Sequence, residues 1–149
     1  MTAGSTLLAF DFDGTLAPIH ADPGQVRIDR AAAALLAQTT RLEGVVVAIV
    51  SGRDADDLAR RVDTPGAYLV ASHGLEIHAP GGVMVRDTPP LSFAFPPDLH
   101  AEIGASGLRL ESKKHAIALH WRDIPYEAVA PVVDLFRTWA RGEALDVIE

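Results

Sequence analysis

The chain has 149 residues, 48% of them hydrophobic and 22% charged, which is the composition of a globular protein and excludes a disordered one. Its formal net charge of −7 at pH 7, without any basic run, argues against a nucleic-acid partner. Cysteine is absent, which excludes disulfides and thiolate metal sites and favours a cytoplasmic location. Residues 1–6 lack a basic secretory start and no apolar stretch approaches the ~18–20 residues of a membrane span, so we expect no membrane partner.

The first predicted element is an apolar strand over residues 7–12, which ends among two carboxylates. Alternate side chains of a strand share a face, so Asp11 and Asp13 should point the same way. Two carboxylates this close together need a cation or a proton between them, and their pKa values move apart. Such a pair can supply a nucleophile and a neighbouring general acid/base. Gly14 permits a sharp turn, and the hydroxyl and amide of Thr15 are candidate anion ligands. Because α/β sheets bind ligands at the carboxyl ends of their strands, we predict a catalytic site here.

A helix and a second strand follow. Asp29 is the predicted N-cap of a helix from residue 30 to about residue 42, closed by Gly44. The continuous β-branched run at residues 45–50 is typical of a strand covered on both faces, as in a parallel sheet.

The second strand ends in Ser51, Gly52 and Arg53, and Asp54 or Asp56 is predicted to cap a helix that continues through residue 62. A serine hydroxyl with the free amides of a helix start forms an anion site, here beside the end of the first strand. We therefore expect the two motifs to meet.

A third strand is predicted over residues 68–72, and His73 comes next. One histidine is weak evidence, so two interpretations stay open: a residue fixed in a turn, or a group in the binding pocket.

Turn residues between residues 80 and 97 mark a domain boundary, which divides the chain into residues 1–79 and 80–149. The second part is predicted to hold a helix over residues 99–105 capped by Asp98, two strands joined near residues 112–115, and an amphipathic helix between Pro125 and Gly142. The tail at residues 144–149 is predicted to start another strand.

The segment from Asp11 to Thr15 resembles the first motif of the haloacid-dehalogenase-like phosphatases. The resemblance implies that Asp11 attacks phosphorus to form an aspartyl-phosphate, while Asp13 protonates the leaving oxygen and activates water. It implies a Mg²⁺ cofactor on the Asp11 carboxylate and the Asp13 main-chain carbonyl, a choice that suits a hard, oxygen-seeking cation. Ser51 matches the family's second motif, which holds the phosphoryl group. The implied fold class is α/β, a Rossmann-like parallel-sheet core, here incomplete, with an inserted α+β cap.

The string His-Gly-Leu-Glu at residues 73–76 and the Leu-Ala-Pro-Ile at residues 16–19 resemble the trehalose-6-phosphate phosphatases in particular. Residues 111–122 are similar to the cap strands of that family, in which a Glu and a Lys grip the sugar hydroxyls. The resemblance therefore implies a sugar phosphate, trehalose 6-phosphate, as the partner molecule. It assigns sugar contacts to four residues: Glu111, Lys113, His120 and Arg122. The alternative for all four is that they are solvated charges of a hairpin.

Two other functions stay open. The chain is also compatible with a phosphatase of the same superfamily that acts on sucrose phosphate or mannosylglycerate phosphate. It is equally compatible with an incomplete or inactive module, because the phosphate-binding lysine and acidic metal loop that the family places after its cap have no match here. The only lysines, Lys113 and Lys114, lie in cap-like sequence. In that case we expect the strand at residues 7–12 to be an exposed edge that promotes self-association.

Overall fold

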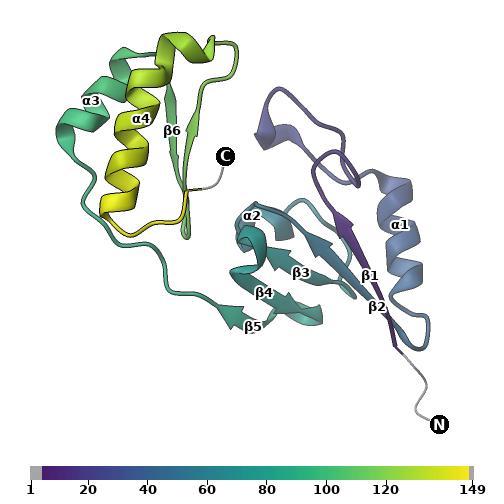
Figure 1. Cartoon of the computed structure of the whole chain (residues 1–149). Coiled ribbons are helices and arrows are strands. Elements are labelled where there is room, and N and C mark those ends of the chain that lie inside the picture. The colour runs from purple at the N-terminus through teal and green to yellow at the C-terminus, as the bar shows by residue number, and fades with distance from the viewer. Residues whose placement is uncertain (1–4, 148–149) are drawn as a thin grey trace. The chain divides into compact units, whose positions relative to one another are not determined.

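The structure is a computed structural model that describes residues 5–147, and Figure 1 shows its course from the purple N-terminus to the yellow C-terminus. The chain separates into two compact units, Met1–Pro89 and Pro90–Glu149. Each unit has its own hydrophobic core. No helix among the described residues is both long and apolar enough to cross a membrane.

The first unit is built on a five-stranded sheet in the order β1-β2-β3-β4-β5. Its strands are β1 (Thr6–Asp11), β2 (Val45–Val50), β3 (Tyr68–Ala71), β4 (Glu76–Ala79) and β5 (Val83–Asp87). The first three strands are parallel, which confirms the expected core topology, and the last two run antiparallel. In the β1–β2 register Asp11 lies opposite Val50, so both strands end at one level.

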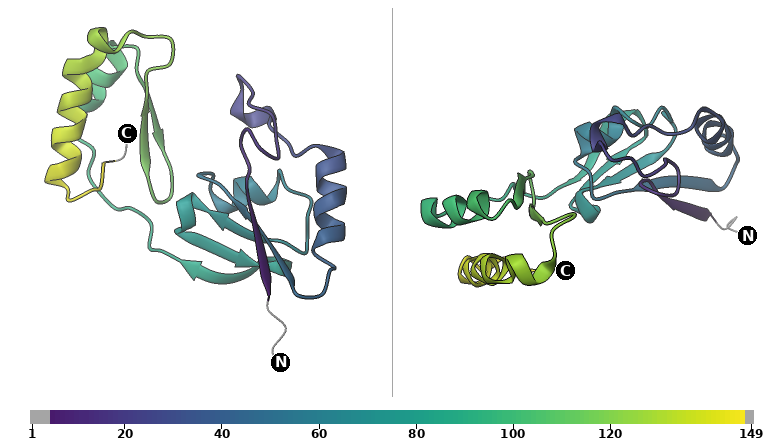
Figure 2. Two further views of the ribbon diagram at one scale, coloured as in Figure 1. Left: turned by 45° about the vertical axis from the view of Figure 1, so that its right-hand side comes forward. Right: turned by 90° about the horizontal axis from the view of Figure 1, so that it is seen from above.

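Two helices cover this sheet: α1 (Arg30–Thr39) packs on β2, and α2 (Ala55–Ala59) packs on β3 and β4 (Figure 2). The Asp29 side chain accepts hydrogen bonds from the amides of Ala31 and Ala32 at 2.8 and 3.2 Å, which confirms it as the N-cap of α1. The second helix is shorter than predicted, and Asp54, at its N-cap position, makes no side-chain capping bond. The core beneath the helices includes the fully buried side chains of Phe12, Ile49 and Leu58.

The expected domain boundary between residues 79 and 80 falls inside a hairpin that sequence reasoning missed. The segment Pro80–Gly82 is the 3-10 turn that joins β4 to β5, with φ of +81° and +79° at Gly81 and Gly82. Every side chain of β5 is exposed, so the strand lacks the alternation of buried and exposed positions that identifies a strand. The boundary between the two units therefore lies after residue 89, ten residues later than the sequence suggests.

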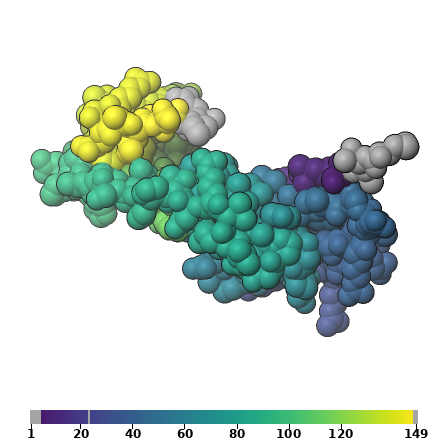
Figure 3. All heavy atoms as spheres, turned by 90° about the horizontal axis from the view of Figure 1, so that it is seen from below, coloured from purple at the N-terminus to yellow at the C-terminus, as the bar shows by residue number. Residues whose placement is uncertain are grey.

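The sheet leaves β1 and β5 as its two edges, and β1 is the edge expected from the sequence. The Leu7 side chain of β1 is 64% exposed. Figure 3 shows the start of β1, in purple, at the surface of the first unit.

The second unit contains α3 (Pro97–Ala105), the antiparallel strands β6 (Arg109–Ser112) and β7 (Ile117–His120), and α4 (Tyr126–Gly142). Its core is formed by apolar residues of both helices and by the residue just before β6: Leu99, Ile103, Leu108, Val129 and Val133. The N-cap of α3 is Pro96, so the prediction that Asp98 caps this helix is wrong; Asp98 lies in the first turn. Residues 144–147 form no strand, and residues 148–149 of the predicted strand lie outside the described residues.

Candidate active site

The end of β1 is held against β2 by its backbone. The Phe12 amide donates to the Val50 carbonyl at 3.1 Å, and the buried Phe12 ring anchors the strand end in the core. Asp11 and Asp13, on either side of Phe12, are both exposed. Because side chains alternate along the strand, the two carboxylates face solvent and the Phe12 ring between them fixes their positions.

A tight loop follows, in which Gly14 has a φ of +88° that favours glycine. The Gly14 amide donates to the Ala17 carbonyl at 2.8 Å, and the Thr15 amide donates to the Phe12 carbonyl at 3.4 Å. Both amides are therefore engaged within the loop. The hydroxyl of the exposed Thr15 is therefore a better placed donor for an anion than the Thr15 amide. The phosphate-binding role of Gly14 and Thr15 stays a prediction.

The structure brings the two sequence motifs together at the ends of β1 and β2. The buried Ser51 donates from Oγ to Asp13 Oδ2 at 3.4 Å and accepts from the Arg53 amide at 3.1 Å. The Ser51 amide donates to the Val70 carbonyl of β3 at 2.9 Å. A hydroxyl buried between two parallel strands is thereby aimed at the carboxylate end of β1.

The Arg53 guanidinium contacts two carboxylates in this structure, and the phosphate contact predicted for Arg53 stays a prediction. Its guanidinium grips the Asp13 carboxylate, with Nε 2.9 Å from Oδ2 and Nη2 2.7 Å from Oδ1, and its Nη1 lies 3.0 Å from Asp57 Oδ2. The guanidinium carbon lies 5.7 Å from the centre of the Phe12 ring. The hydrogen bond with Asp13 is the main cause of the raised pKa of Arg53. Sequence reasoning missed both Asp57 and this pairing.

Asp57 is shared by three arginines: Arg61 at 2.6 Å, Arg53 at 3.0 Å and Arg60 at 3.6 Å. Its pKa is lowered to about 2, mainly by the hydrogen bond from Arg61 and then by that from Arg53, against the opposing effect of burial. A carboxylate on α2 therefore supports, through Arg53, the position of Asp13.

We expect Asp57→Asn to lower the free energy of unfolding by about 1–2 kcal/mol at pH 7. Because the pKa of Asp57 is about 2 in the folded protein, below its ordinary 3.8, this stability is present above about pH 4 and is lost as the pH falls toward 2. Urea unfolding at pH 7 and at pH 3 measures it, with Asp56→Asn, at an exposed neighbour, as the control. Equal stability of Asp57→Asn and the parent chain at pH 7 would contradict the role of Asp57.

His73 lies in the turn between β3 and β4, with a φ of +55°, as the turn interpretation of this residue requires. Its amide donates to the Ser51 carbonyl at 3.1 Å, and its ring packs on Gly52, where an added Cβ would lie 2.5 Å from His73 Nε2. The ring therefore borders the second motif, and Gly52 is required for this close approach. A substrate contact by His73 stays a prediction.

Glu76 was not identified from the sequence as a structural residue. Its carboxylate is only 3% exposed and accepts hydrogen bonds from the Ser72 hydroxyl at 3.0 Å and the Ala55 amide at 3.3 Å. It thereby ties the β3–β4 turn to the start of α2, directly after the second motif. A buried carboxylate that is bonded in this way fixes the loop that carries Ser51.

In the second unit the four predicted sugar contacts lie on or beside the β6–β7 hairpin. Glu111 Oε2 lies 2.7 Å from His120 Nε2 and 3.8 Å from the Arg109 guanidinium. Burial alone would raise the pKa of Glu111, but the hydrogen bond from His120 and the charges of Lys113 and Arg109 outweigh it and lower the pKa. The hairpin turn is closed by the Lys113 amide, which donates to the Ala116 carbonyl at 2.9 Å.

A surface pocket is lined by His120 and Arg122 together with Leu119 and Trp121. Glu111 and His120 thus form a pair whose sequence separation of nine residues is bridged by strand pairing. The resemblance to cap strands did not show that these two residues bind each other.

Parallel strands β1 and β2 that end in Asp-x-Asp-Gly-Thr and in a serine form the arrangement expected of the haloacid-dehalogenase-like fold. The family model described as trehalose-phosphatase matches residues 9–140. The chain belongs to the trehalose-phosphatase family.

Relatives and solved structures agree with this assignment. The chain is 34% identical to the trehalose-phosphate phosphatase of Mycobacterium leprae over 154 aligned positions and 36% identical to that of Mycobacterium avium over 145. The alignments cover 99% and 93% of this chain, but only 35% and 36% of those proteins. The chain therefore spans about a third of the length of these relatives.

The fold matches that of the C-terminal domain of Candida albicans trehalose-6-phosphate phosphatase, with a TM-score of 0.69 at 22% identity over 91% of this chain and 49% of that one. A trehalose-6-phosphate phosphatase related protein gives a TM-score of 0.65 at 18% identity, covering 97% of this chain and 64% of that one. Both confirm the α/β fold class.

Proposed function

We propose that the protein containing this chain hydrolyses trehalose 6-phosphate to trehalose and phosphate through an aspartyl-phosphate intermediate. The observation that supports this most strongly is the meeting of the two strand ends, where Ser51 Oγ lies 3.4 Å from the Asp13 carboxylate and Asp11 is exposed beside them. Membership of the trehalose-phosphatase family favours this substrate over sucrose phosphate and mannosylglycerate phosphate. The test is release of phosphate from trehalose 6-phosphate.

Asp11 is the proposed nucleophile. Its side chain makes no hydrogen bond or ion pair within residues 5–147, so a carboxylate oxygen is free to attack. As the bond from this oxygen to phosphorus forms, the ester bond to the sugar oxygen breaks, and Asp13, which takes up a proton when it turns from Arg53 to the substrate, gives that proton to the leaving oxygen. Water, deprotonated by Asp13, then hydrolyses the phosphorylated Asp11.

Arg53 is a positioning residue in this proposal. Its two-point contact orients the Asp13 carboxylate, and its third nitrogen stays on Asp57. When Asp13 turns toward the leaving oxygen, the guanidinium therefore keeps one carboxylate partner. This permits movement of Asp13 without leaving the arginine unpaired.

The oxygen donors at the end of β1 fit Mg²⁺. The Asp11 carboxylate is exposed, and the Asp13 main-chain carbonyl accepts no hydrogen bond in the part of the chain that the structure describes. These two groups would hold the ion, whereas the Asp13 carboxylate is engaged by Arg53. When bound, the ion offsets the repulsion between a carboxylate and a phosphate dianion.

The pair of Glu111 and Lys113 is proposed to select the sugar. Loss of a charge-assisted hydrogen bond costs about 1.5–3 kcal/mol, so we expect Glu111→Ala or Lys113→Ala to lower kcat/KM for trehalose 6-phosphate roughly 10- to 150-fold. Turnover of a small aryl phosphate should change little, and Ser112→Ala, at an exposed position of the same strand, is the control. Equal losses on both substrates would show a structural role only.

We further propose that copies of this chain associate through β1. This strand is a sheet edge in the described structure, and its residue Leu7 is 64% exposed. Unpaired edges are templates for strand pairing between chains. Sedimentation velocity of residues 1–149 should show association that Leu7→Lys reduces, whereas a monomer at all concentrations would contradict it.

The cytoplasmic location stays a prediction.

A further inference from the structure

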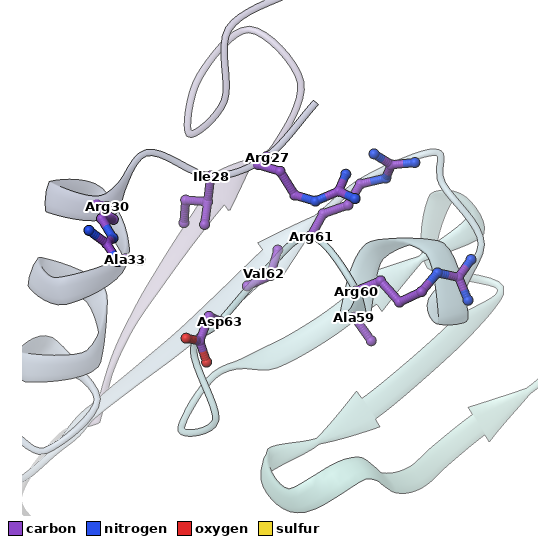
Figure 4. A pocket seen from close by; sticks show the side chains of 9 residues that line it. All are labelled: Arg27, Ile28, Arg30, Ala33, Ala59, Arg60, Arg61, Val62 and Asp63. Atoms are coloured by element: carbon purple, nitrogen blue, oxygen red, sulfur yellow. The ribbon is translucent and has the colours of Figure 1, made fainter. Parts of the chain in front are cut away.

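A pocket of about 400 Å³ in the first unit lies between the start of α1 and the chain that follows α2. Four of the eleven arginines of this acidic protein line it: Arg27, Arg30, Arg60 and Arg61. The carboxylate in its lining is that of Asp63, so the lining carries a formal charge of +3. Figure 4 shows Arg27 and Arg61 with their guanidinium groups close together and Arg30 on α1 across the pocket.

The two central arginines are fixed by the same backbone oxygens. Arg27 Nη1 donates to the carbonyls of Gly24 and Val26 at 3.1 and 2.7 Å, and Arg61 Nη1 donates to the same two carbonyls at 3.0 and 2.8 Å. Two guanidinium groups are thereby held side by side. Like charges at this separation repel each other, so the arrangement favours an anion beside the exposed Arg27.

The nearby carboxylates do not neutralise this charge. Arg61 is paired with Asp57, which is already shared with Arg53 and Arg60. Neither Arg27 nor Arg30 forms an ion pair within residues 5–147, and Asp63 forms none either. Positive charge is therefore left over at Arg27 and Arg30.

The place of Arg30 is a second, independent observation. Arg30 is the first residue of α1, and the first turn of this helix contains no acidic residue. The amides of Ala31 and Ala32 at this helix start are already bonded to the Asp29 carboxylate, so the positive charge that this end of α1 offers the pocket is that of the Arg30 guanidinium. Arg30 is exposed and forms no ion pair within residues 5–147, so its guanidinium is available to an anion in the pocket.

We propose that this pocket binds the phosphate or pyrophosphate group of a small metabolite. Arg27 and Arg30 contact the anion, and apolar residues such as Ile28 and Val62 of the lining pack against its carbon part. The pocket volume exceeds that of a single phosphate, which leaves room for such a body. None of its lining residues belongs to the proposed active site around Asp11, so this is a separate site.

The test uses the whole chain without magnesium, with pyrophosphate as the probe. Titration of the ¹⁵N-labelled protein should shift the backbone amide signals of residues 27–33 and 59–63. The double variant Arg27→Gln/Arg30→Gln should bind at least about tenfold more weakly. Arg41→Gln removes the same charge from an exposed position outside the pocket and should bind like the parent chain.

Several results would overturn the proposal. These are an absence of binding, equal affinity in the double variant and the parent chain, or shifts confined to residues 11–15 and 51–53. Equal weakening by Arg41→Gln would show attraction by overall charge and not by the pocket. Unchanged far-ultraviolet circular dichroism of the double variant distinguishes lost binding from lost folding. The proposed phosphatase reaction does not enter this test.

Discussion

Replacement of Asp11 by Asn is expected to lower phosphate release by at least about a thousandfold, because an amide is a far weaker nucleophile toward phosphorus than a carboxylate. Asp11 is exposed at the end of β1, and its side chain has no partner within the described residues, so the fold does not depend on its charge. The unfolding midpoint should stay within the range of surface substitutions. Phosphate release at saturating substrate measures the effect.

A matched control for this variant is Asp98→Asn. Asp98 is an exposed aspartate in the first turn of α3, and the same change of charge there should leave turnover near that of the parent. Activity of Asp11→Asn at the level of this control would exclude Asp11 as the nucleophile.

Replacement of Asp13 by Asn is expected to lower turnover by about 10²–10⁴-fold, the usual contribution of general acid–base catalysis. Asparagine fills the same space but neither donates a proton to the leaving oxygen nor accepts one from water. The substitution also removes the negative charge to which two nitrogens of Arg53 donate hydrogen bonds.

The two roles of Asp13 are separated by the choice of substrate. With an aryl phosphate whose leaving group needs no proton, Asp13→Asn should form phosphorylated protein nearly as fast as the parent but hydrolyse it slowly. Mass spectrometry of the acid-quenched protein detects this intermediate on Asp11. Equal losses for aryl and sugar phosphates, with no intermediate, would show that Asp13 only supports the fold.

Local patterns predicted the first three strands and α1 because their signals lie within a few residues of one another. The β-branched run became β2, and Asp29 caps α1 because an aspartate side chain reaches the amides two and three residues further on. The antiparallel hairpin of β4 and β5 was missed because β5 is exposed throughout. A strand whose side chains are all in solvent leaves no periodic pattern in its sequence.

For the site, the sequence predicted that Ser51 would meet the end of β1, since parallel strands end at the same edge of the sheet. It did not predict that Arg53 pairs with Asp13, because the two are 40 residues apart and the rotamer of a long side chain depends on its surroundings. Asp57 was missed for the same reason. Its significance comes from the arginines around it and not from any motif.

The measurement that tests the central claim most directly is phosphate release by the protein that contains this chain, with magnesium, from trehalose 6-phosphate, sucrose 6-phosphate and glucose 6-phosphate in parallel. We expect trehalose 6-phosphate to give the highest kcat/KM, with a kcat in the usual range of about 1–10³ s⁻¹ that falls to background in Asp11→Asn. A higher kcat/KM for another sugar phosphate, or no release from trehalose 6-phosphate by the folded protein, would contradict the proposed function.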